Sequence, residues 1–270
     1  MSIITAPVSK MEELKNLYIE LSAKSCNQRC KHCYIDFPVS RNVKDFISVD
    51  KIKQAIADTK EQNLECIYLT GAEPMTHPEF NAILRICLKR ADVCVCTNAS
   101  FINEKKARFL KKVEEEGGNE IFFKLSIDHY NEIKNDDIRG RGSYRQTVNA
   151  IKSLIKYDFN PILSIVNYYR EDEKTLLHEF KKVCEKIGFD TVLGNFEINN
   201  YYNKYSPQHG VVENVSEDII CKNSRILTEK GVYVCPFLTN DHRGRMGNSF
   251  SDYSKKMPLE TNFCYICNQK

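Results

Sequence analysis

The sequence lacks the apolar segments that would carry the chain into or across a membrane. No stretch approaches the ~18 consecutive apolar residues that a membrane-spanning helix needs, and residues 1–15 contain no apolar core of signal-peptide length. A marked excess of either charge is also lacking, because 39 lysines and arginines against 36 aspartates and glutamates leave a net charge of +3. These absences argue against membrane and nucleic-acid partners, and we expect a cytoplasmic globular protein.

Cysteine, by contrast, is abundant, with twelve residues in the chain. An even number in a secreted protein would suggest disulfides, but the lack of a signal segment argues against that compartment. The spacing is more informative, because three cysteines follow the pattern Cys26-x3-Cys30-x2-Cys33 and a further pair forms Cys264-x2-Cys267. Such spacing is typical of metal or cluster sites, since one short loop can direct several thiolates at one centre.

Strand-like and helix-like segments alternate six times between residues 17 and 196. The strand-like segments are short and rich in β-branched or aromatic residues, and amphipathic segments of helical length separate them. This alternation predicts parallel strands joined by helical crossovers. Six units are fewer than the eight that close a full barrel, so the predicted fold class is α/β, a partial (β/α)6 TIM-like barrel. The expected strands are 17–21, 66–69, 93–96, 122–127, 162–166 and 192–196, and the expected helices are 48–62, 78–90, 103–116, 143–157 and 172–187.

The pattern changes after residue 196. Residues 199–210 are rich in asparagine and tyrosine, which suggests a linker or a substrate-facing loop, with Tyr201, Tyr202 and Tyr205 as candidates to border a pocket. A hairpin with its turn at Lys230-Gly231 follows, and the remaining tail has too little apolar surface to fold without a metal centre. We therefore divide the chain into a barrel domain (1–198), a linker (199–220) and a small irregular C-terminal domain (221–270).

The triad of Cys26, Cys30 and Cys33 lies in the loop after the first predicted strand. A 4Fe–4S cluster needs four ligands, usually thiolates, and this loop supplies three, which would leave one iron open to a substrate or cofactor. The triad, followed by the aromatic Tyr34, resembles the radical S-adenosylmethionine (SAM) superfamily. That resemblance implies a cluster whose open iron binds SAM, and reductive cleavage of SAM to a 5′-deoxyadenosyl radical that abstracts hydrogen from a substrate. A zinc-binding loop with a distant fourth ligand is the alternative.

Motifs after the later strands extend the same resemblance. Gly71-Ala72-Glu73-Pro74 resembles the family's Gly-Gly-Glu-Pro motif, which holds the amino group of SAM, and the carboxylate of Glu73 is a natural partner for an ammonium. Asn98 lies in a segment similar to the family's Thr-Asn-Gly. Ser126 and Asp128 resemble its Ser-x-Asp signature, which lies near the methionine carboxylate or the ribose of SAM.

Two further residues complete the expected cofactor site. Arg139, with Arg141 as the alternative, matches an Arg-Gly segment whose arginine pairs with the methionine carboxylate, a role that suits a fork of N–H donors. Asn167, at the end of the fifth expected strand, is a candidate for contacts near the adenosine.

Four other cysteines supply the full ligand set of a second 4Fe–4S cluster: Cys221, Cys235, Cys264 and Cys267. Their spacing, with a hairpin between the first two, resembles the SPASM and twitch auxiliary-cluster extensions of the superfamily. A full SPASM extension has more cysteines after the Cys-x2-Cys pair, whereas this sequence ends three residues later. We therefore expect the twitch type, with one auxiliary cluster. A structural zinc held by four cysteines fits the spacing almost as well.

The leading function hypothesis is a radical SAM oxidoreductase that passes an electron from its small-molecule or peptide substrate to the auxiliary cluster. A peptide maturase that makes a thioether, a carbon–carbon crosslink or an epimer is the alternative, and a non-catalytic iron–sulfur or zinc protein is the third hypothesis. The resemblance also implies an electron donor such as flavodoxin or ferredoxin. No residue is assigned as the general base.

The five remaining cysteines are predicted to be small buried apolar side chains without a chemical role. They are Cys66, Cys94 and Cys96 in expected strands, and Cys87 and Cys184 in expected helices. His129 follows the fourth expected strand, where an ordinary hydrogen-bonding role is expected.

Overall fold

One open sheet forms the centre of the fold. The computed structural model describes residues 6–35, 44–199, 212, 214–217 and 219–267, and within them nine strands join in the order β10-β9-β8-β2-β3-β4-β5-β6-β7. The strands from β2 to β7 are parallel, and β10 and β7 are the edges of the described sheet, so the expected partial barrel is confirmed. The parallel strands are β2 (Asn16–Ser22), β3 (Cys66–Gly71), β4 (Asp92–Thr97), β5 (Ile121–Ser126), β6 (Ile162–Val166) and β7 (Phe196–Asn199).

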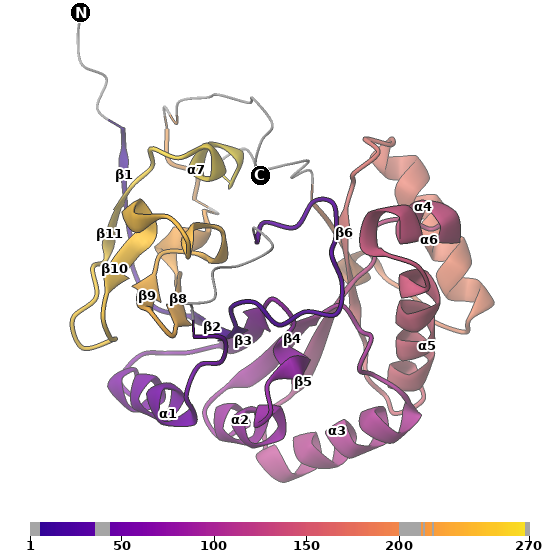
Figure 1. Ribbon diagram of the computed structural model, residues 1–270, viewed down its shortest axis with the longest axis horizontal. Coiled ribbons are helices and arrows are strands. Elements are labelled where there is room, and N and C mark those ends of the chain that lie inside the picture. The colour runs from indigo at the N-terminus through magenta and orange to yellow at the C-terminus, as the bar shows by residue number, and fades with distance from the viewer. Residues whose placement is uncertain (1–5, 36–43, 200–211, 213, 218, 268–270) are drawn as a thin grey trace, which may run out of the picture.

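The crossover helices lie along the outer face of the parallel strands (Figure 1). All five expected helices are present, with ends shifted by a few residues, and α4 is an additional helix that the sequence pattern did not indicate. The helices are α1 (Val49–Asp58), α2 (Phe80–Leu88), α3 (Glu104–Gly117), α4 (Glu132–Arg139), α5 (Ser143–Ile155) and α6 (Glu173–Lys186). The residues at two helix ends are of the types that favour helix boundaries. Ser48 caps α1 by accepting a hydrogen bond from the Lys51 amide at 3.3 Å, and Gly188 follows α6 with a φ of +76°.

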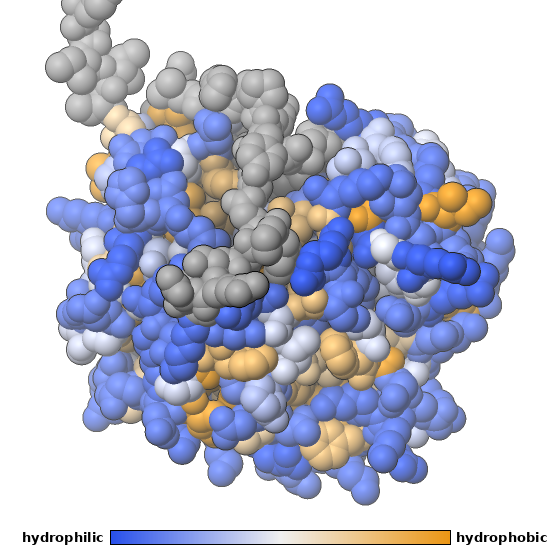
Figure 2. All heavy atoms as spheres, viewed as in Figure 1, coloured by the Kyte–Doolittle hydropathy of each residue, from blue (hydrophilic) through white to orange (hydrophobic). Residues whose placement is uncertain are grey.

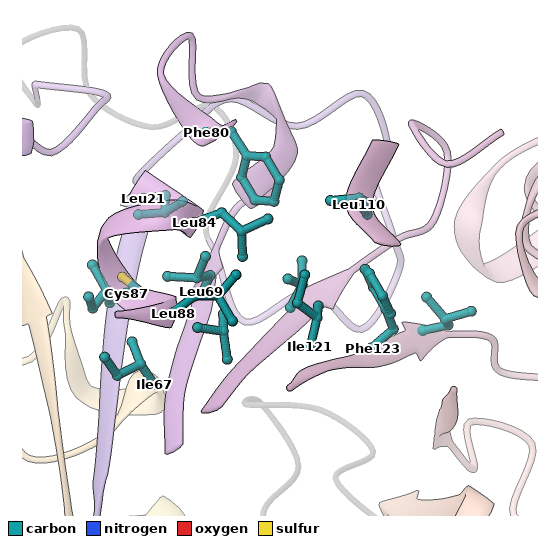
Figure 3. Packing of buried hydrophobic residues seen from close by; sticks show 14 of the residues in the cluster. Leu21, Ile67, Leu69, Phe80, Leu84, Cys87, Leu88, Leu110, Ile121 and Phe123 are labelled. Atoms are coloured by element: carbon teal, nitrogen blue, oxygen red, sulfur yellow. The ribbon is translucent and has the colours of Figure 1, made fainter. Parts of the chain in front are cut away.

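The two faces of the parallel strands differ in polarity, and this difference creates the cavity described below. Side chains at alternate positions point outward into the core, where each fully buried large apolar side chain contributes roughly 1.5–3 kcal/mol. Figure 3 shows Leu21, Ile67, Leu69, Ile121 and Phe123 of the strands beside Phe80, Leu84, Cys87 and Leu88 of α2 and Leu110 of α3. The intervening positions point inward and include polar residues such as Lys124, Ser126 and Glu197, which line a cavity.

The sixth strand was expected at 192–196, and this position was wrong. β7 begins at Phe196, and Leu193–Asn195 instead form a 3-10 turn. The cause is the Asn195 side chain, whose oxygen accepts a hydrogen bond from the Val192 amide at 2.8 Å and whose nitrogen donates to the Asn160 side chain at 2.6 Å. An asparagine that bonds to nearby backbone in this way favours a turn over a strand.

The C-terminal region extends the barrel sheet. The predicted hairpin is confirmed as β8 (Ser224–Thr228) and β9 (Gly231–Tyr233), but its turn lies at residues 229–230, one residue before the expected Lys230-Gly231. β8 also pairs in parallel with β2. The first strand of the chain lies beside the last part of this region in a separate two-stranded sheet, shown at the left of Figure 1. The two strands of this small sheet are β1 (Val8–Lys10) and β11 (Lys256–Pro258). The C-terminal region also contains β10 (Arg245–Gly247) and α7 (Asn262–Cys267). The expected linker loop at 199–210 lies, apart from Asn199, outside the described residues.

The visible surface is mainly hydrophilic, with small and separate apolar patches (Figure 2). Among the described residues, no helix is both long enough and apolar enough to cross a membrane.

Gly71 is the last residue of β3 and lies beside the backbone of Ser22 at the end of β2. It has a φ of +132°, and a methyl group in its place would overlap with the Ser22 carbonyl oxygen and lie 2.9 Å from the Ser22 nitrogen. We predict that Gly71→Ala lowers the free energy of unfolding by about 2–4 kcal/mol, because the new side chain is strained and cannot be accommodated by moving a flexible neighbour. Urea unfolding monitored by circular dichroism measures this loss.

Gly118→Ala is the matched control. Gly118 also has a positive φ, of +81°, but no atom lies within 4 Å of the position of an added methyl group. The free energy of unfolding of this variant should therefore fall by only about 1 kcal/mol, because of backbone strain. If both variants lost the same free energy of unfolding, the close contact between Gly71 and Ser22 would not be the cause of the loss.

Candidate active site

A cavity of about 400 Å³ opens at the carboxyl ends of the parallel strands. This end of a parallel barrel is where loops and strand ends can converge on a ligand. The cavity lies between the inner face of the sheet, the cysteine loop after β2, and the C-terminal region. Its walls include Tyr18, Tyr68, Lys124, Ser126, Ser164 and Glu197 from the strands, and Ile220, Pro236, Phe237, Phe263 and Cys267 from the C-terminal region.

The three N-terminal cysteines share this cavity. Cys26, Cys30 and Cys33 all line it, and none of the twelve cysteines, which all lie in the described part of the chain, forms a disulfide. The Cys26 sulfur accepts a hydrogen bond from the Asn98 side chain at 3.6 Å, and the Cys30 sulfur accepts one from Arg139 at 3.8 Å. Burial raises the pKa of Cys30 to about 11, although the Arg139 charge opposes this shift. A bound cation would favour the thiolate over the thiol, so the site suits a metal centre.

A buried donor at the same wall also fits a ligand there. The Nε2 atom of Gln28 is buried and has no hydrogen-bond partner among the described residues, and Gln28 lines the cavity. Buried polar groups usually have partners, so this amide fits a bound group with acceptor atoms, such as the sulfides of a cluster.

The cysteine loop is anchored at its start by a carboxylate that no sequence motif singles out. Asp45 accepts hydrogen bonds from the Ser22 hydroxyl at 2.9 Å and from the Lys24 and Ser25 amides at 3.0 and 3.1 Å. Residues 22–25 precede the first cysteine directly, so this cluster of bonds fixes the direction in which the loop leaves β2.

Glu73 presents a carboxylate at the cavity wall. Its oxygens accept hydrogen bonds from the Thr97 hydroxyl at 2.7 Å, the Asn98 amide at 2.8 Å and the Met75 amide at 3.1 Å. Burial raises the pKa of Glu73 even though these three donors favour the charged form. A ligand ammonium would stabilise the carboxylate, which makes this position suited to a cationic group.

Behind the cysteines, one buried carboxylate joins three parts of the chain. Asp128 lies 2.6 Å from the Arg139 guanidinium and 2.7 Å from His32, and it accepts a hydrogen bond from the Val166 amide at 3.0 Å. Burial alone would raise the pKa of Asp128, but Arg139 and His32 outweigh burial and hold that pKa at about 2. Arg139 thus lines the cavity, and its ion pair with the buried Asp128 fixes the orientation of its guanidinium.

The four C-terminal cysteines lie together around a second, smaller cavity. Cys221, Cys235, Cys264 and Cys267 all line a space of about 20 Å³, and Cys267 also lines the main cavity. Within the described chain, no three His, Cys, Asp or Glu side chains are gathered into a set that could hold a single metal ion. The sulfurs therefore surround a shared space without converging on one ion-sized point.

A fully buried arginine lies beside these cysteines. Arg225 is 0% exposed, and its guanidinium donates to the backbone carbonyl oxygens of Cys221 and Ser224, both at 2.7 Å. Burial lowers the pKa of Arg225, and negative charge on Cys221 or Cys235 would oppose that shift. A cluster bound by several thiolates carries such charge, so the donor set and the buried arginine fit a cluster site.

Comparison with known proteins identifies the barrel. The family model of the radical SAM superfamily matches residues 22–183, more than half of the chain. The chain belongs to the radical SAM superfamily.

Relatives of different activity resemble this radical SAM chain. The antilisterial bacteriocin subtilosin biosynthesis protein AlbA of Bacillus subtilis is 30% identical over 131 residues, which are 48% of this chain and 28% of AlbA. The GTP 3′,8-cyclase of Mannheimia succiniciproducens is 24% identical over 264 residues, which cover 93% of this chain and 73% of the cyclase. The chain thus spans little more than a quarter of AlbA but most of the cyclase.

Solved structures show the same fold. Histidine-tagged anSMEcpe with bound AdoMet has a TM-score of 0.68 at 16% identity, covering 95% of this chain and 80% of that one. A structure of anSMEcpe with AdoMet and the Cp18Cys peptide has a TM-score of 0.64 at 15% identity, and the match covers 95% of this chain and 83% of that chain.

The radical SAM chain brings most of the predicted cofactor residues to one cavity, but not all. Pro74 is buried at the start of a 3-10 turn, and Asp128 lies behind Arg139 instead of at the wall. Asn167 does not line the cavity, because its amide exchanges hydrogen bonds with the Glu171 backbone at 2.8 and 2.9 Å. Arg141 is exposed, so the geometry favours Arg139 over this alternative. The predicted residues that line the cavity are Gly71, Ala72, Glu73, Asn98, Ser126 and Arg139.

The five other cysteines differ in their surroundings. Cys94 is buried and Cys66 is only partly buried, and neither lines the cavity. Cys87 and Cys184 are buried in the hydrophobic core, as expected for side chains without a chemical role. Cys96, expected to be one of these, lines the cavity instead, because β4 directs this position to the inner face. His129 has the ordinary role expected of it, since it is buried and its Nε2 lies 2.8 Å from Glu171.

Sequence reasoning missed the polar inner wall of the barrel. Lys124 and Glu197 form an ion pair of 2.7 Å there, and Tyr18 and Tyr68 stack with ring centroids 4.4 Å apart. The alternation of β5 does signal that Lys124 faces away from Phe123 and Leu125, but only the assembled sheet brings it to Glu197.

We predict that Asp128→Asn lowers the free energy of unfolding at pH 7 by about 3–5 kcal/mol, because Arg139 loses a buried ionic partner. The pKa of Asp128 is about 2, and in the unfolded chain it is about 4. Its contribution is therefore complete above about pH 4 and is lost as the pH falls toward 2, so the difference between the two proteins should shrink over that range. Urea unfolding at several pH values measures this.

Asp137→Asn is the matched control, because Asp137 also pairs with a cation, Lys31, at 2.7 Å, but on the exposed surface. This variant should change stability little. If both variants lost the same stability, the structural importance of Asp128 would be refuted.

Proposed function

We propose that the chain cleaves SAM reductively to a 5′-deoxyadenosyl radical and uses this radical to abstract hydrogen from a substrate. The observation that carries the proposal is one cavity that holds the triad Cys26, Cys30 and Cys33 together with the carboxyl group of Glu73 and the guanidinium of Arg139. A 4Fe–4S cluster held by the three thiolates would supply the electron for the cleavage and an open iron for SAM.

The residues around the triad would bind the two charged groups of the methionyl part of SAM. Glu73 would bind the ammonium, and its three hydrogen-bond donors keep the carboxylate at a fixed position. Arg139 would bind the carboxylate, with Asp128 and His32 as positioning residues behind it. Asn98 and Ser126 would provide further polar contacts from the ends of β4 and β5. Pairing opposite charges at two points would fix the orientation of SAM in the cavity.

We further propose that residues 221–270 form an auxiliary-cluster extension of the barrel domain 1–198, joined through 199–220. The four cysteines around the second cavity would hold a second 4Fe–4S cluster, and the buried Arg225 would offset part of its negative charge. Such a cluster would accept the electron left on the substrate after hydrogen abstraction. A flavodoxin or ferredoxin would supply the electron that cleaves SAM. Zinc is the competing occupant of this site.

The second candidate function is peptide modification. It is supported by the similarity to AlbA, a bacteriocin biosynthesis protein, and by the fold shared with anSMEcpe, whose structure contains a peptide. An oxidoreductase that passes an electron to the auxiliary cluster requires an oxidised product, whereas an epimerase would return a product of unchanged oxidation state.

The first test is to reconstitute the protein anaerobically and to compare wild type with Cys30→Ala. We expect about eight irons per wild-type chain and formation of 5′-deoxyadenosine from SAM under reducing conditions. Cys30→Ala should lose this activity and about four irons, because the triad cannot hold its cluster with two thiolates. Cys66→Ser, at a cysteine outside both sets, should behave as wild type. Wild-type protein that contains zinc without iron and cleaves no SAM would refute the proposed function.

The second test separates the two metal sites through Cys235→Ser. Loss of one of four thiolates should lower the iron content from about eight to about four per chain, while 5′-deoxyadenosine is still formed. The iron content is measured by colorimetry and the metal identity by mass spectrometry. Wild-type protein with about four irons and one zinc would show that the C-terminal site is a zinc site and would exclude it as an electron acceptor.

A further inference from the structure

The cavity wall carries an ion pair that the proposed chemistry does not use. The ammonium of Lys124 on β5 lies 2.7 Å from the carboxylate of Glu197 on β7, and Ser164 lies on the strand between them. The two side chains are 24% and 34% exposed, and both line the cavity. A ligand in the cavity can therefore reach both charges of this pair, whereas in the pair of Asp128 and Arg139 only Arg139 lines the cavity.

The charges that line the cavity argue against a phosphorylated substrate. Among the described lining residues, the lysine and arginine side chains are Lys124 and Arg139, and each is paired with a carboxylate. A triphosphate requires several donors that are not already neutralised, as arginine clusters and lysines provide in phosphate sites. The pair of Lys124 and Glu197 instead offers a cation and an anion side by side, with no net charge.

The surroundings of the pair favour a flat group with both a donor and an acceptor. Tyr18 and Tyr68 stack with an angle of 14° between their rings, and the Lys124 nitrogen lies 5.5 Å from the centre of the Tyr68 ring. These rings provide a planar apolar surface next to the two charges. Burial alone would lower the pKa of Lys124, but Glu197 outweighs burial and raises it, so the side chain remains a hydrogen-bond donor at neutral pH.

We propose that Lys124 and Glu197 bind a carboxamide unit of the substrate, whose carbonyl oxygen accepts from Lys124 and whose N–H donates to Glu197. A residue of an extended peptide presents its own N–H and C=O on the same side, as in a β-ladder, and the side chain of asparagine or glutamine presents both on one group. Charged partners strengthen such hydrogen bonds in a partly dehydrated cavity. This inference rests on the proposed function, since it takes the cavity as the active site, and it assigns the substrate class as amide-containing, with peptides foremost.

The test is ligand-observed saturation-transfer NMR on the reconstituted full chain with SAM. The probes are N-acetyl-trialanine N-methylamide for the main-chain unit, propionamide for the side-chain unit, and GTP for a nucleotide. The variants are Lys124→Met and the exchange Lys124→Glu with Glu197→Lys, which keeps both charges but reverses donor and acceptor. The control is Lys156→Met, which removes a lysine from an exposed pair with Glu104, also 2.7 Å long.

We expect wild type to bind at least one amide probe, and the bound probe identifies the main-chain or the side-chain source. Lys124→Met and the exchange variant should each weaken that binding at least tenfold, whereas Lys156→Met should stay within twofold of wild type. Binding of GTP without either amide, binding of no probe, or amide binding that is unchanged in the exchange variant would each overturn the inference. Failure of the wild type to form 5′-deoxyadenosine in the same samples would instead refute the proposed function.

Discussion

The buried carboxylate of Asp128 is the interaction on which the arrangement of the site depends. It links His32 in the cysteine loop, Arg139 at the last position of α4 and the backbone of β6 within one group of hydrogen bonds and ion pairs. Its own amide donates to the side chain of Asn135 at 2.9 Å, which ties α4 to the end of β5. An unpaired carboxylate at this depth would be costly, so each of these partners is held in place by the same requirement for charge compensation.

The polarity of the strands explains why this arrangement surrounds a cavity instead of a second core. The outer face is apolar and is covered by helices, whereas the inner face presents tyrosine, lysine, serine and glutamate side chains that need polar partners. The C-terminal region closes one side through aromatic rings. Tyr34, next to Cys33, meets Phe237 with centroids 5.8 Å apart, and Phe237 stacks on Phe263, next to Cys264, at 5.3 Å. The N-terminal triad and Cys267 of the C-terminal set therefore line the same cavity from opposite ends of the chain.

The sequence was sufficient for features that depend on short-range pattern. The parallel strands β2 to β6 were predicted because each has an alternating or apolar run of the right length. The triad was predicted because its three cysteines lie within eight residues. The helix α4 was missed because Asn135, Asp136 and Asp137 resemble a loop, and only contacts such as that of Asn135 with the Ser143 hydroxyl at 2.9 Å show why they are helical.

Features that depend on the assembled sheet could not be predicted. Lys124 and Glu197 are ordinary strand residues 73 positions apart, and they meet because β6 lies between β5 and β7 with a particular register. The parallel pairing of β8 with β2 likewise joins the two ends of the chain in one sheet, which no local pattern indicates. Asn167 follows a strand end as expected, yet its side chain is engaged by Glu171 and does not reach the cavity.

The most direct test of the account is an electron–nuclear double resonance measurement on the reduced, reconstituted protein with SAM labelled with ¹⁵N at its amino group. If the triad of Cys26, Cys30 and Cys33 leaves one iron open, and Glu73 and Arg139 hold the methionyl group beside it, the cluster signal should show hyperfine coupling to the labelled nitrogen. A reduced cluster signal without any coupling to that nitrogen, at SAM concentrations that saturate binding, would contradict the assignment of this cavity as the SAM site.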